Sequence, residues 1–154
     1  MNEEMKLQIR RLNQRIKELD SIYHTAANQI GVSDGEITVW SALLSAEQDY
    51  SQQELCDLIS LPRQTVNSVI SKMVKKGFVY LEHIPGTRNQ KTIHLTQQGM
   101  DFGRERVKWI FLAEERALEQ ADSRQIQNCI EMIEAFNRHF KRELNIHKGS
   151  IEDL

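Results

Sequence analysis

The sequence is poor in cysteine and in long apolar runs, and each shortage argues against one class of protein. Its 154 residues include only two cysteines, Cys56 and Cys129, each alone in an amphipathic pattern. We therefore expect small core residues rather than a disulfide framework or redox sensors. No apolar run approaches the roughly 20 residues that cross a bilayer, and the amino end, MNEEMKLQIRRLNQ, lacks the apolar core of a secretory signal. We expect a cytoplasmic protein that has no membrane partner.

Motifs of enzymes and of metal sites are also missing. The sequence contains no HExxH, no GxGxxG after a strand and no nucleophile elbow, and HKGS near its end lacks the upstream glycine of a phosphate loop. Its five histidines are scattered instead of paired as metal ligands usually are. We expect no catalytic residue, no cofactor and no metal, although histidines that converge in a dimer are an alternative source of a metal site.

No linker rich in proline, glycine and serine divides the chain, so we expect one domain over residues 1–154. Residues 1–31 form a long helix in this interpretation, because apolar residues recur there at alternating spacings of three and four. These seam residues are Met5, Ile9, Leu12, Ile16, Leu19, Tyr23, Ala26 and Ile30. A stripe this even favours packing against a partner helix, and the alternative is that the helix folds back along its own chain.

The pattern of residues 33–96, in the middle of the chain, predicts three shorter helices and a hairpin. The pairs Ser33 with Glu36 and Ser51 with Glu54 have the spacing of capping boxes, and each opens a helix. The next helix, over residues 62–76, begins at a proline and ends at a glycine. The segments FVYLEHI and KTIHLT then read as two antiparallel strands around the turn PGTRNQ. We predict a mainly α fold with a small β-hairpin wing, which is a winged helix-turn-helix.

Two further helices follow this region. Residues 97–120, which begin after Thr96, are expected to form one long connecting helix. Residues 121–146 form the last helix, with Asp122 and Gln125 as a third capping pair. Long helices therefore flank the winged helix on both sides.

Positive charge is concentrated in one part of the chain. The formal net charge is -2, yet residues 62–91 contain six bases and a single acid, Glu82. The bases are Arg63, Lys72, Lys75, Lys76, Arg88 and Lys91. A local basic surface within a nearly neutral chain indicates a nucleic-acid partner.

The helix over residues 62–76 has the properties of one that enters a DNA major groove. One side carries the apolar residues Val66, Val69, Ile70, Met73 and Val74, and the other side carries polar residues without carboxylates. The candidate base contacts are Gln64, Thr65, Asn67 and Ser68, near its amino end, and Arg63 is a candidate for either guanine or a phosphate. We assign phosphates to Lys72 and Lys75, and to Ser51 and Gln52 at the start of the preceding helix. The alternative is that the polar arc is only a solvated helix face.

The segments SQQELCDLISLPRQTVNSVISKMVKKGFV and PGTRNQKTIHLTQQG, together with the long flanking helices, resemble the multiple-antibiotic-resistance regulator (MarR) family of transcription factors. The resemblance covers nearly the whole chain. It implies a homodimeric repressor, or else an activator, that binds a pseudo-palindromic operator in double-stranded DNA. It also implies that residues 1–31 and 121–146 form the dimer interface. The alternative is a winged-helix module that binds protein and recognises no specific DNA.

The wing departs from the family pattern. Many members have an acid, any residue and then an arginine, where this sequence has Thr87, Arg88 and Asn89. We expect Arg88, with Lys91 beside it, to make the wing's contact with DNA. The uncharged Asn89 predicts weaker discrimination of narrow minor grooves.

The resemblance also implies a small aromatic effector that lowers DNA affinity. Tyr23, His24, Trp40 and Trp109 are the candidates for its pocket. The competing interpretation of each is a core residue, because aromatic residues at helical spacing usually pack inside. The sequence does not identify the effector.

Overall fold

The computed structural model describes residues 2–152, and it describes side chains over residues 2–145. The chain divides into two compact units, residues 1–111 and residues 112–154, each of which we describe by itself. The expectation of a single domain over the whole chain stays a prediction. No helix among the described residues is long and apolar enough to cross a membrane.

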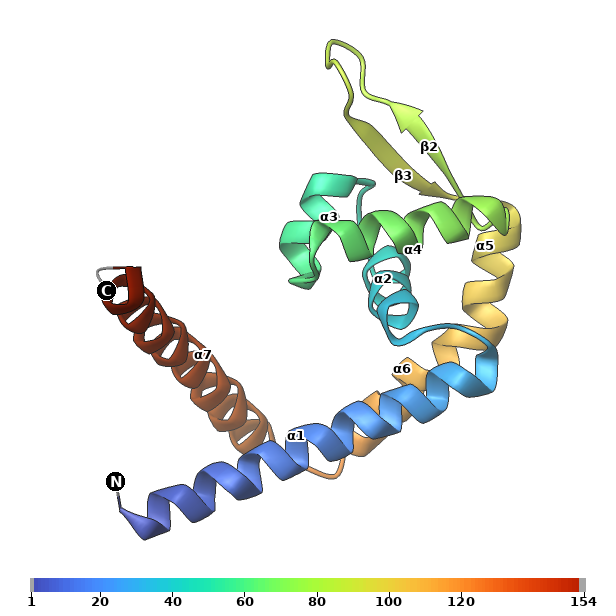
Figure 1. The fold of residues 1–154 in the computed structure, drawn as a ribbon. Coiled ribbons are helices and arrows are strands. Elements are labelled where there is room, and N and C mark those ends of the chain that lie inside the picture. Colours follow the sequence, from blue (N-terminus) through green and yellow to red (C-terminus); the bar gives the residue numbers. More distant parts are fainter. Residues whose placement is uncertain (1, 153–154) are drawn as a thin grey trace. The chain divides into compact units, whose positions relative to one another are not determined.

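The first unit begins with α1 (Glu3–Ile30), the long helix that the seam predicts (Figure 1). Asn2 caps its start by accepting a hydrogen bond from the backbone N–H of Glu4, and Gly31 ends it with a left-handed φ of 72°. Ala27 is buried near the carboxyl end of the helix, whereas the apolar residues of its first turns are exposed. Those exposed residues include Met5, Ile9, Ile16 and Leu19.

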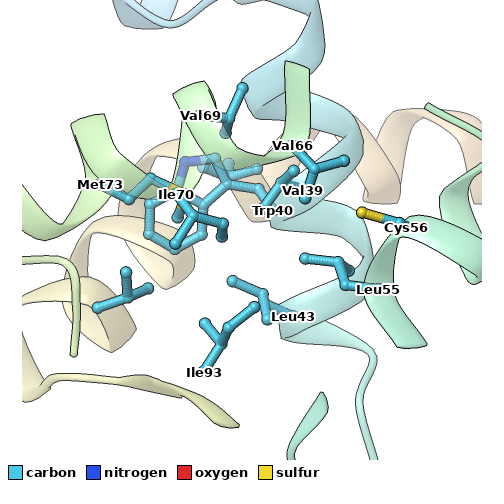
Figure 2. Close-up of a cluster of buried hydrophobic side chains, with 12 residues drawn as sticks. Val39, Trp40, Leu43, Leu55, Cys56, Val66, Val69, Ile70, Met73 and Ile93 are labelled. Atoms are coloured by element: carbon cyan, nitrogen blue, oxygen red, sulfur yellow. The ribbon is translucent and has the colours of Figure 1, made fainter. Parts of the chain in front are cut away.

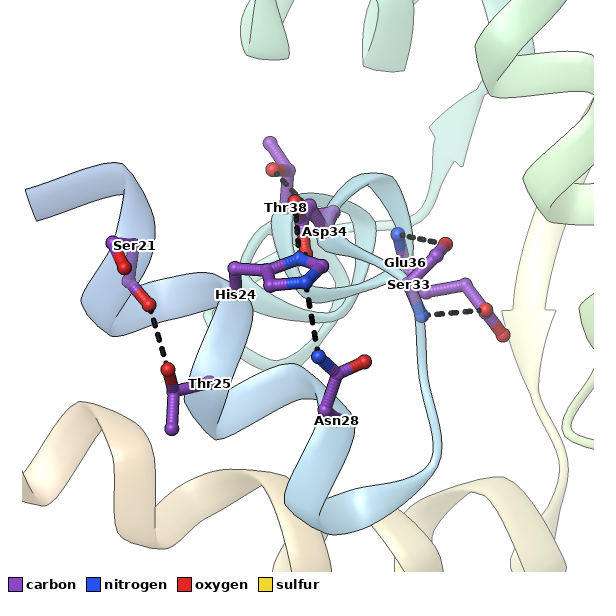
Figure 3. Close-up of polar contacts among 8 residues, drawn as sticks. All are labelled: Ser21, His24, Thr25, Asn28, Ser33, Asp34, Glu36 and Thr38. Carbon is purple, nitrogen blue, oxygen red and sulfur yellow. Dashed lines mark hydrogen bonds and ion pairs between the residues drawn. The ribbon is translucent and has the colours of Figure 1, made fainter. Parts of the chain in front are cut away.

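The helix-turn-helix lies between Asp34 and Lys75. It comprises α2 (Asp34–Leu44), α3 (Gln52–Ile59) and α4 (Arg63–Lys75). Both predicted capping boxes are confirmed, because the N-cap serine and the third helical glutamate exchange hydrogen bonds at the start of α2 and of α3. Figure 3 shows the box at α2, where the Ser33 N–H donates to Glu36 over 3.0 Å. Pro62 is the N-cap residue of α4, one position before the first turn in which we expected it.

The wing is part of a three-stranded antiparallel sheet in the order β1-β3-β2. Strands β2 (Val79–His83) and β3 (Lys91–Leu95) form the predicted hairpin. Strand β1 (Tyr50–Ser51), which we did not predict, pairs with β3 so that Tyr50 faces Ile93. Two residues are too short a segment to show strand alternation in a sequence. The effect of β1 is to fasten the start of α3 to the base of the wing.

The core of this unit lies between α2, α3, α4 and the sheet (Figure 2). Trp40, Leu55, Ile70, Met73 and Ile93 are among its fully buried side chains. Trp40 is tilted against the rings of Phe78 and Phe102, at centroid distances of 5.6 and 5.4 Å. This packing fixes the apolar side of α4 and leaves its polar side outward.

Two apolar residues of the helix-turn-helix are exposed. Leu58 of α3 is 55% exposed, because Leu55 and Cys56 occupy the inner face of this short helix. Val74, which we assigned to the apolar side of α4, is also exposed. A wheel at 100° per residue places both at the margin of an apolar arc, where burial depends on the neighbouring elements.

The expected helix over residues 97–120 has three parts, α5 (Gln97–Phe102), a π-helical turn η1 (Gly103–Val107) and α6 (Lys108–Leu118). Thr96 caps α5, as expected, by accepting a hydrogen bond from the Gly99 N–H over 3.0 Å. Gly103 begins the π turn, where a Cβ atom would lie 2.6 Å from a Leu44 methyl group. A larger residue at this point would therefore force the Leu44 side chain to shift.

The second unit consists of the end of α6 and the helix α7 (Ser123–Glu152). Asp122 and Gln125 exchange hydrogen bonds at its start, so the third capping pair is confirmed. The helix continues to Glu152, past the end that we expected at residue 146. Over the residues with described side chains, α7 exposes an apolar stripe that comprises Ile130, Ile133, Phe136, Phe140 and Leu144.

Candidate nucleic-acid interface

Helix α4 separates its side chains into two sets. Val66, Val69, Ile70 and Met73 are buried, which fixes the rotation of the helix about its axis. The exposed set comprises all the α4 residues that the sequence singled out, namely Arg63, Gln64, Thr65, Asn67, Ser68, Lys72 and Lys75. The structure thus brings these residues together on one accessible surface. We name this set, together with Arg88 and Lys91 of the wing, the basic surface.

The amino end of α4 adds partial positive charge to this surface. Pro62 supplies no side-chain hydrogen bond to the first turn, and that turn contains no acid. The N–H groups at the start of a helix point along its axis and favour an anion. A phosphate group near Arg63 would therefore meet both a guanidinium group and the helix terminus.

A pair of charged residues holds the other end of α4. The Lys76 ammonium group lies 3.0 Å from the carboxylate of Glu36, which is buried at the start of α2. Burial by itself would raise the pKa of Glu36, but hydrogen bonds from the Ser33 N–H and from Lys76 outweigh it and lower the pKa. Glu36 is therefore a buried anion that ties the carboxyl end of α4 to α2.

The start of α3 is less accessible than the sequence suggested. Only 8% of Ser51 is exposed, and its hydroxyl oxygen accepts the hydrogen bond from the Glu54 N–H over 3.2 Å. Its own N–H donates to the Glu54 carboxylate, which lowers the pKa of Glu54. Gln52 is half-buried. Ser51 thus serves the helix cap, and Gln52 presents less of its amide than the α4 residues do.

The wing carries two exposed bases. Arg88 lies in the turn between the strands and Lys91 begins β3. The turn is closed by Thr87, whose hydroxyl donates to the Ile84 carbonyl over 2.8 Å, and by Gly86 with a φ of 79°. The position of Arg88 next to this ordered turn gives the wing a charged tip.

The bases of the basic surface are not neutralised within the part of the chain that the structure describes. No ion pair within 4.0 Å among those residues involves Arg63, Lys72, Lys75, Arg88 or Lys91. The one acid in this region, Glu82, instead lies 3.3 Å from His94 on the neighbouring strand. The surface is therefore able to neutralise an external polyanion.

The four candidates for an effector pocket are not brought together. Trp40 is fully buried, and its indole N–H has no hydrogen-bond partner among the described residues. Tyr23 is half-buried in a second cluster between α1 and α6. His24 is exposed and lies 3.0 Å from Asp34 and 3.0 Å from Asn28 (Figure 3). Trp40 therefore has a role in the core.

Trp109, by contrast, lines a hollow on the surface. This hollow has a volume of about 520 Å³ and lies along α1. Its other lining residues are Glu18, Ser21, Ile22, Thr25, Ala26 and Gln29. The residues with described side chains contain no group of three or more histidines, cysteines and acids that could hold a metal ion.

A polar cluster at the base of the wing was missed by the sequence analysis. His94 lies 3.1 Å from Asp49 and stacks on Tyr80 at a ring distance of 4.9 Å. Tyr80 and His94 are opposite residues in the register of β2 and β3. The sequence could have predicted this pair, because aligning the two strands of the predicted hairpin places Tyr80 opposite His94.

Three helices followed by an antiparallel wing, with a basic surface over the third helix and the wing, define the winged-helix class. The family described as sugar-specific transcriptional regulator TrmB matches residues 27–93 of this chain. No curated protein matches the chain.

Several solved structures share this fold. AbsC, a MarR family transcriptional regulator from Streptomyces coelicolor, has a TM-score of 0.78 and 13% identity over 92% of this chain and 97% of its own. NMB1585, a MarR family regulator from Neisseria meningitidis, has a TM-score of 0.77 and 16% identity over 94% and 98%. Sco3205, a MarR family transcriptional regulator from Streptomyces coelicolor solved in complex with DNA, has a TM-score of 0.76 and 16% identity over 90% and 88%. The chain has the winged-helix fold of these MarR family regulators, as the sequence predicted.

Proposed function

We propose that this protein is a MarR-like transcriptional regulator that binds double-stranded DNA through the basic surface. The observation that carries the proposal is the exposed polar side of α4, where polar and basic residues stand without a carboxylate. A major groove accepts one helix, and phosphates repel acids, so this surface fits DNA better than it fits an acidic protein. The solved complex of Sco3205 with DNA supports the same use of the shared fold.

Different parts of the basic surface have different roles in this proposal. Gln64 and Asn67 face the base edges, where amide groups pair with adenine. Arg63 binds a phosphate at the amino end of α4. Lys72 and Lys75 bind phosphates, and the same role falls to Gln52 at the start of α3. In the wing, Arg88 and Lys91 contact the flanking groove or its backbone.

The functional unit is a homodimer. The amino-terminal half of α1 exposes Met5, Ile9 and Ile16, and α7 exposes Ile133 and Phe140. Apolar stripes of this length on long helices favour burial against the same helices of a second copy. The α4 helices of two protomers related by a two-fold axis would contact half-sites about 34 Å apart, so the operator is a pseudo-palindrome.

We also propose that regulation is repression relieved by a small aromatic ligand. The hollow beside α1 supports a ligand site, because Ile22 and Ala26 give it apolar walls and Trp109 gives it an aromatic one. A ligand would release DNA only if it bound more tightly to a dimer with mis-spaced recognition helices. Titration of salicylate into the protein–DNA complex tests this point, with Trp109→Ala as the variant that should lose the response.

The test of DNA binding is fluorescence anisotropy with a labelled duplex from upstream of the protein's own gene. We expect tight binding that survives an excess of scrambled competitor and that weakens steeply with salt. A duplex with one half-site removed should bind far more weakly, because only one protomer would be engaged. Absence of binding even at low salt would contradict the proposal and favour the alternative, a winged-helix module that binds protein.

A further inference from the structure

A second hollow lies at the base of the wing, away from the basic surface. It has a volume of about 420 Å³ and is lined by the end of α2, the loop that follows it, strands β2 and β3, and Met100 of α5. Its apolar lining comprises Leu43, Leu44, Ile93 and Leu95. Leu43 and Ile93 are buried core residues, so the floor of the hollow is held by the packing of the whole unit.

One wall of this hollow is aromatic. The rings of Tyr80 and His94 stack with their centroids 4.9 Å apart and their planes at 17°. Half of Tyr80 is exposed, so part of its ring is accessible from the hollow that it lines. A stacked pair of this kind offers a flat surface to another planar ring.

The charge around the hollow is negative. Glu47 and Asp49 are among its lining residues, which include no lysine and no arginine. Asp49 and Glu82 lie 3.1 and 3.3 Å from His94, so one imidazole stands between two carboxylates. No ion pair within 4.0 Å in the described part of the chain involves Glu47. The region thus has the opposite charge to the basic surface.

We propose that this hollow binds a small planar aromatic compound that carries a protonated amine. The ring would lie on the Tyr80–His94 stack and cover the apolar floor, and the ammonium group would face Glu47 and Asp49. An aromatic anion of the same shape would meet the carboxylates of Glu47 and Asp49 and no lysine or arginine to pair with. Apolar walls with a few charged groups at the rim are the usual composition of a small-molecule site.

A ligand in this hollow would contact the wing and the loop after α2 at the same time. Strand β1 pairs with β3, and Asp49 just before β1 pairs with His94, so the loop after α2 and the wing already meet at this point. An occupant that contacts both sides would change how the wing is held relative to α2. This consequence rests on the proposed DNA-binding function, whereas the binding of the ligand does not.

Isothermal titration calorimetry on the full chain, without DNA, tests the site. The probes are tryptamine and indole-3-acetate, which share one ring system and differ in the sign of their charge. We expect tryptamine to bind at least about tenfold more tightly than indole-3-acetate. Equal affinity of the two probes, or no heat of binding for tryptamine at millimolar concentration, would overturn the proposal.

Variants locate the binding. Glu47→Gln should weaken tryptamine binding about threefold to tenfold, and Tyr80→Leu should weaken it about tenfold by removing the ring surface. Both residues are on the surface, so circular dichroism is expected to be unchanged. Glu18→Gln is the matched control, because Glu18 lines the other hollow beside Trp109. Loss of binding in Glu18→Gln with retention in Glu47→Gln would place the ligand in that other hollow and overturn the assignment.

DNA-binding measurements test whether the bound ligand affects the wing, separately from whether it binds. Tryptamine should change the anisotropy midpoint of the wild-type protein on its operator and leave that of Tyr80→Leu unchanged. If calorimetry shows charge-selective binding but the operator affinity does not move, the coupling to the wing is refuted while the site stands. If the chain fails to bind DNA at all, the proposed function is refuted, and the calorimetric result still decides the ligand site.

Discussion

The salt dependence of DNA binding gives a quantitative test of the basic surface. Each protomer carries five bases there that form no ion pair within the described part of the chain, namely Arg63, Lys72, Lys75, Arg88 and Lys91. If each neutralises one phosphate, a dimer neutralises about ten, and log affinity should fall against log salt with a slope near -9. The double substitution Lys72→Gln with Lys75→Gln removes four of these contacts per dimer. The slope should then be about -5, and near 0.1 M salt affinity should fall by about three to four orders of magnitude.

The assay is anisotropy on one duplex, titrated at several salt concentrations, with thermal unfolding as the check on folding. Both lysines are exposed and unpaired within the described part of the chain, so their substitution should leave the unfolding midpoint nearly unchanged. Lys17→Gln with Lys108→Gln is the matched control, because these exposed lysines lie on α1 and α6. An unchanged slope in the first variant, or an equal loss in the control, would refute the assignment of Lys72 and Lys75 to phosphates.

Four further predictions concern the scaffold and the dimer. Glu36→Gln should destabilise the protein by about 1–3 kcal/mol in chemical denaturation, because Lys76 loses the buried carboxylate that it binds. Since the pKa of Glu36 is lowered in the folded state, its stabilisation is present above its ordinary pKa of 4.5 and should be lost as pH falls below that value, which denaturation at stepped pH measures. Gly99→Ala should cost about 3 kcal/mol or more, since a Cβ atom would lie 2.0 Å from the Phe78 carbonyl oxygen. Ile133→Glu should shift sedimentation equilibrium towards monomer, and a dimer of unchanged strength would contradict the role of α7.

The sequence predicted the helices and the wing well, because their signals are local. Capping boxes, an N-terminal proline and a helix-ending glycine act within one turn, and the structure has all of them. Strand β1 and the π turn were missed for the opposite reason. Strand β1 depends on a partner distant in sequence, β3, and Gly103 at the start of the π turn lies close to Leu44 of α2, which is also distant in sequence. Local patterns do not record such contacts.

The candidate site was predictable to a similar degree. The exposed side of α4 follows from helix periodicity, so the sequence alone identifies its residues. The accessibility of Ser51 and Trp40 could not be predicted in this way, because both depend on tertiary packing. Ser51 is enclosed at the start of α3, and Trp40 is enclosed by Phe78 and Phe102. Aromatic residues suggested a pocket, and the structure assigns one of them to the core.

Helix α4, the wing and α5 meet at a single joint, through which a change in the position of one element would reach the others. The Thr96 hydroxyl donates to the Gly77 carbonyl just after α4 and also accepts from the N–H of Gly99 in α5. Gln98 donates to the Lys76 carbonyl over 3.2 Å, and Gly99 allows the backbone before β2 to approach α5 closely.

Because these contacts are short and mostly involve the backbone, α5 cannot tilt without moving the end of α4 and the start of β2 with it. The continuation of α5 through η1 into α6 passes the buried Ile110, which packs with Ala27 of α1. A ligand that shifts α1 or α6 would thus act on α4 through this joint. A ligand at the base of the wing would act on the other side of the same joint, so ligands in the two hollows would act separately on the proposed DNA-binding surface.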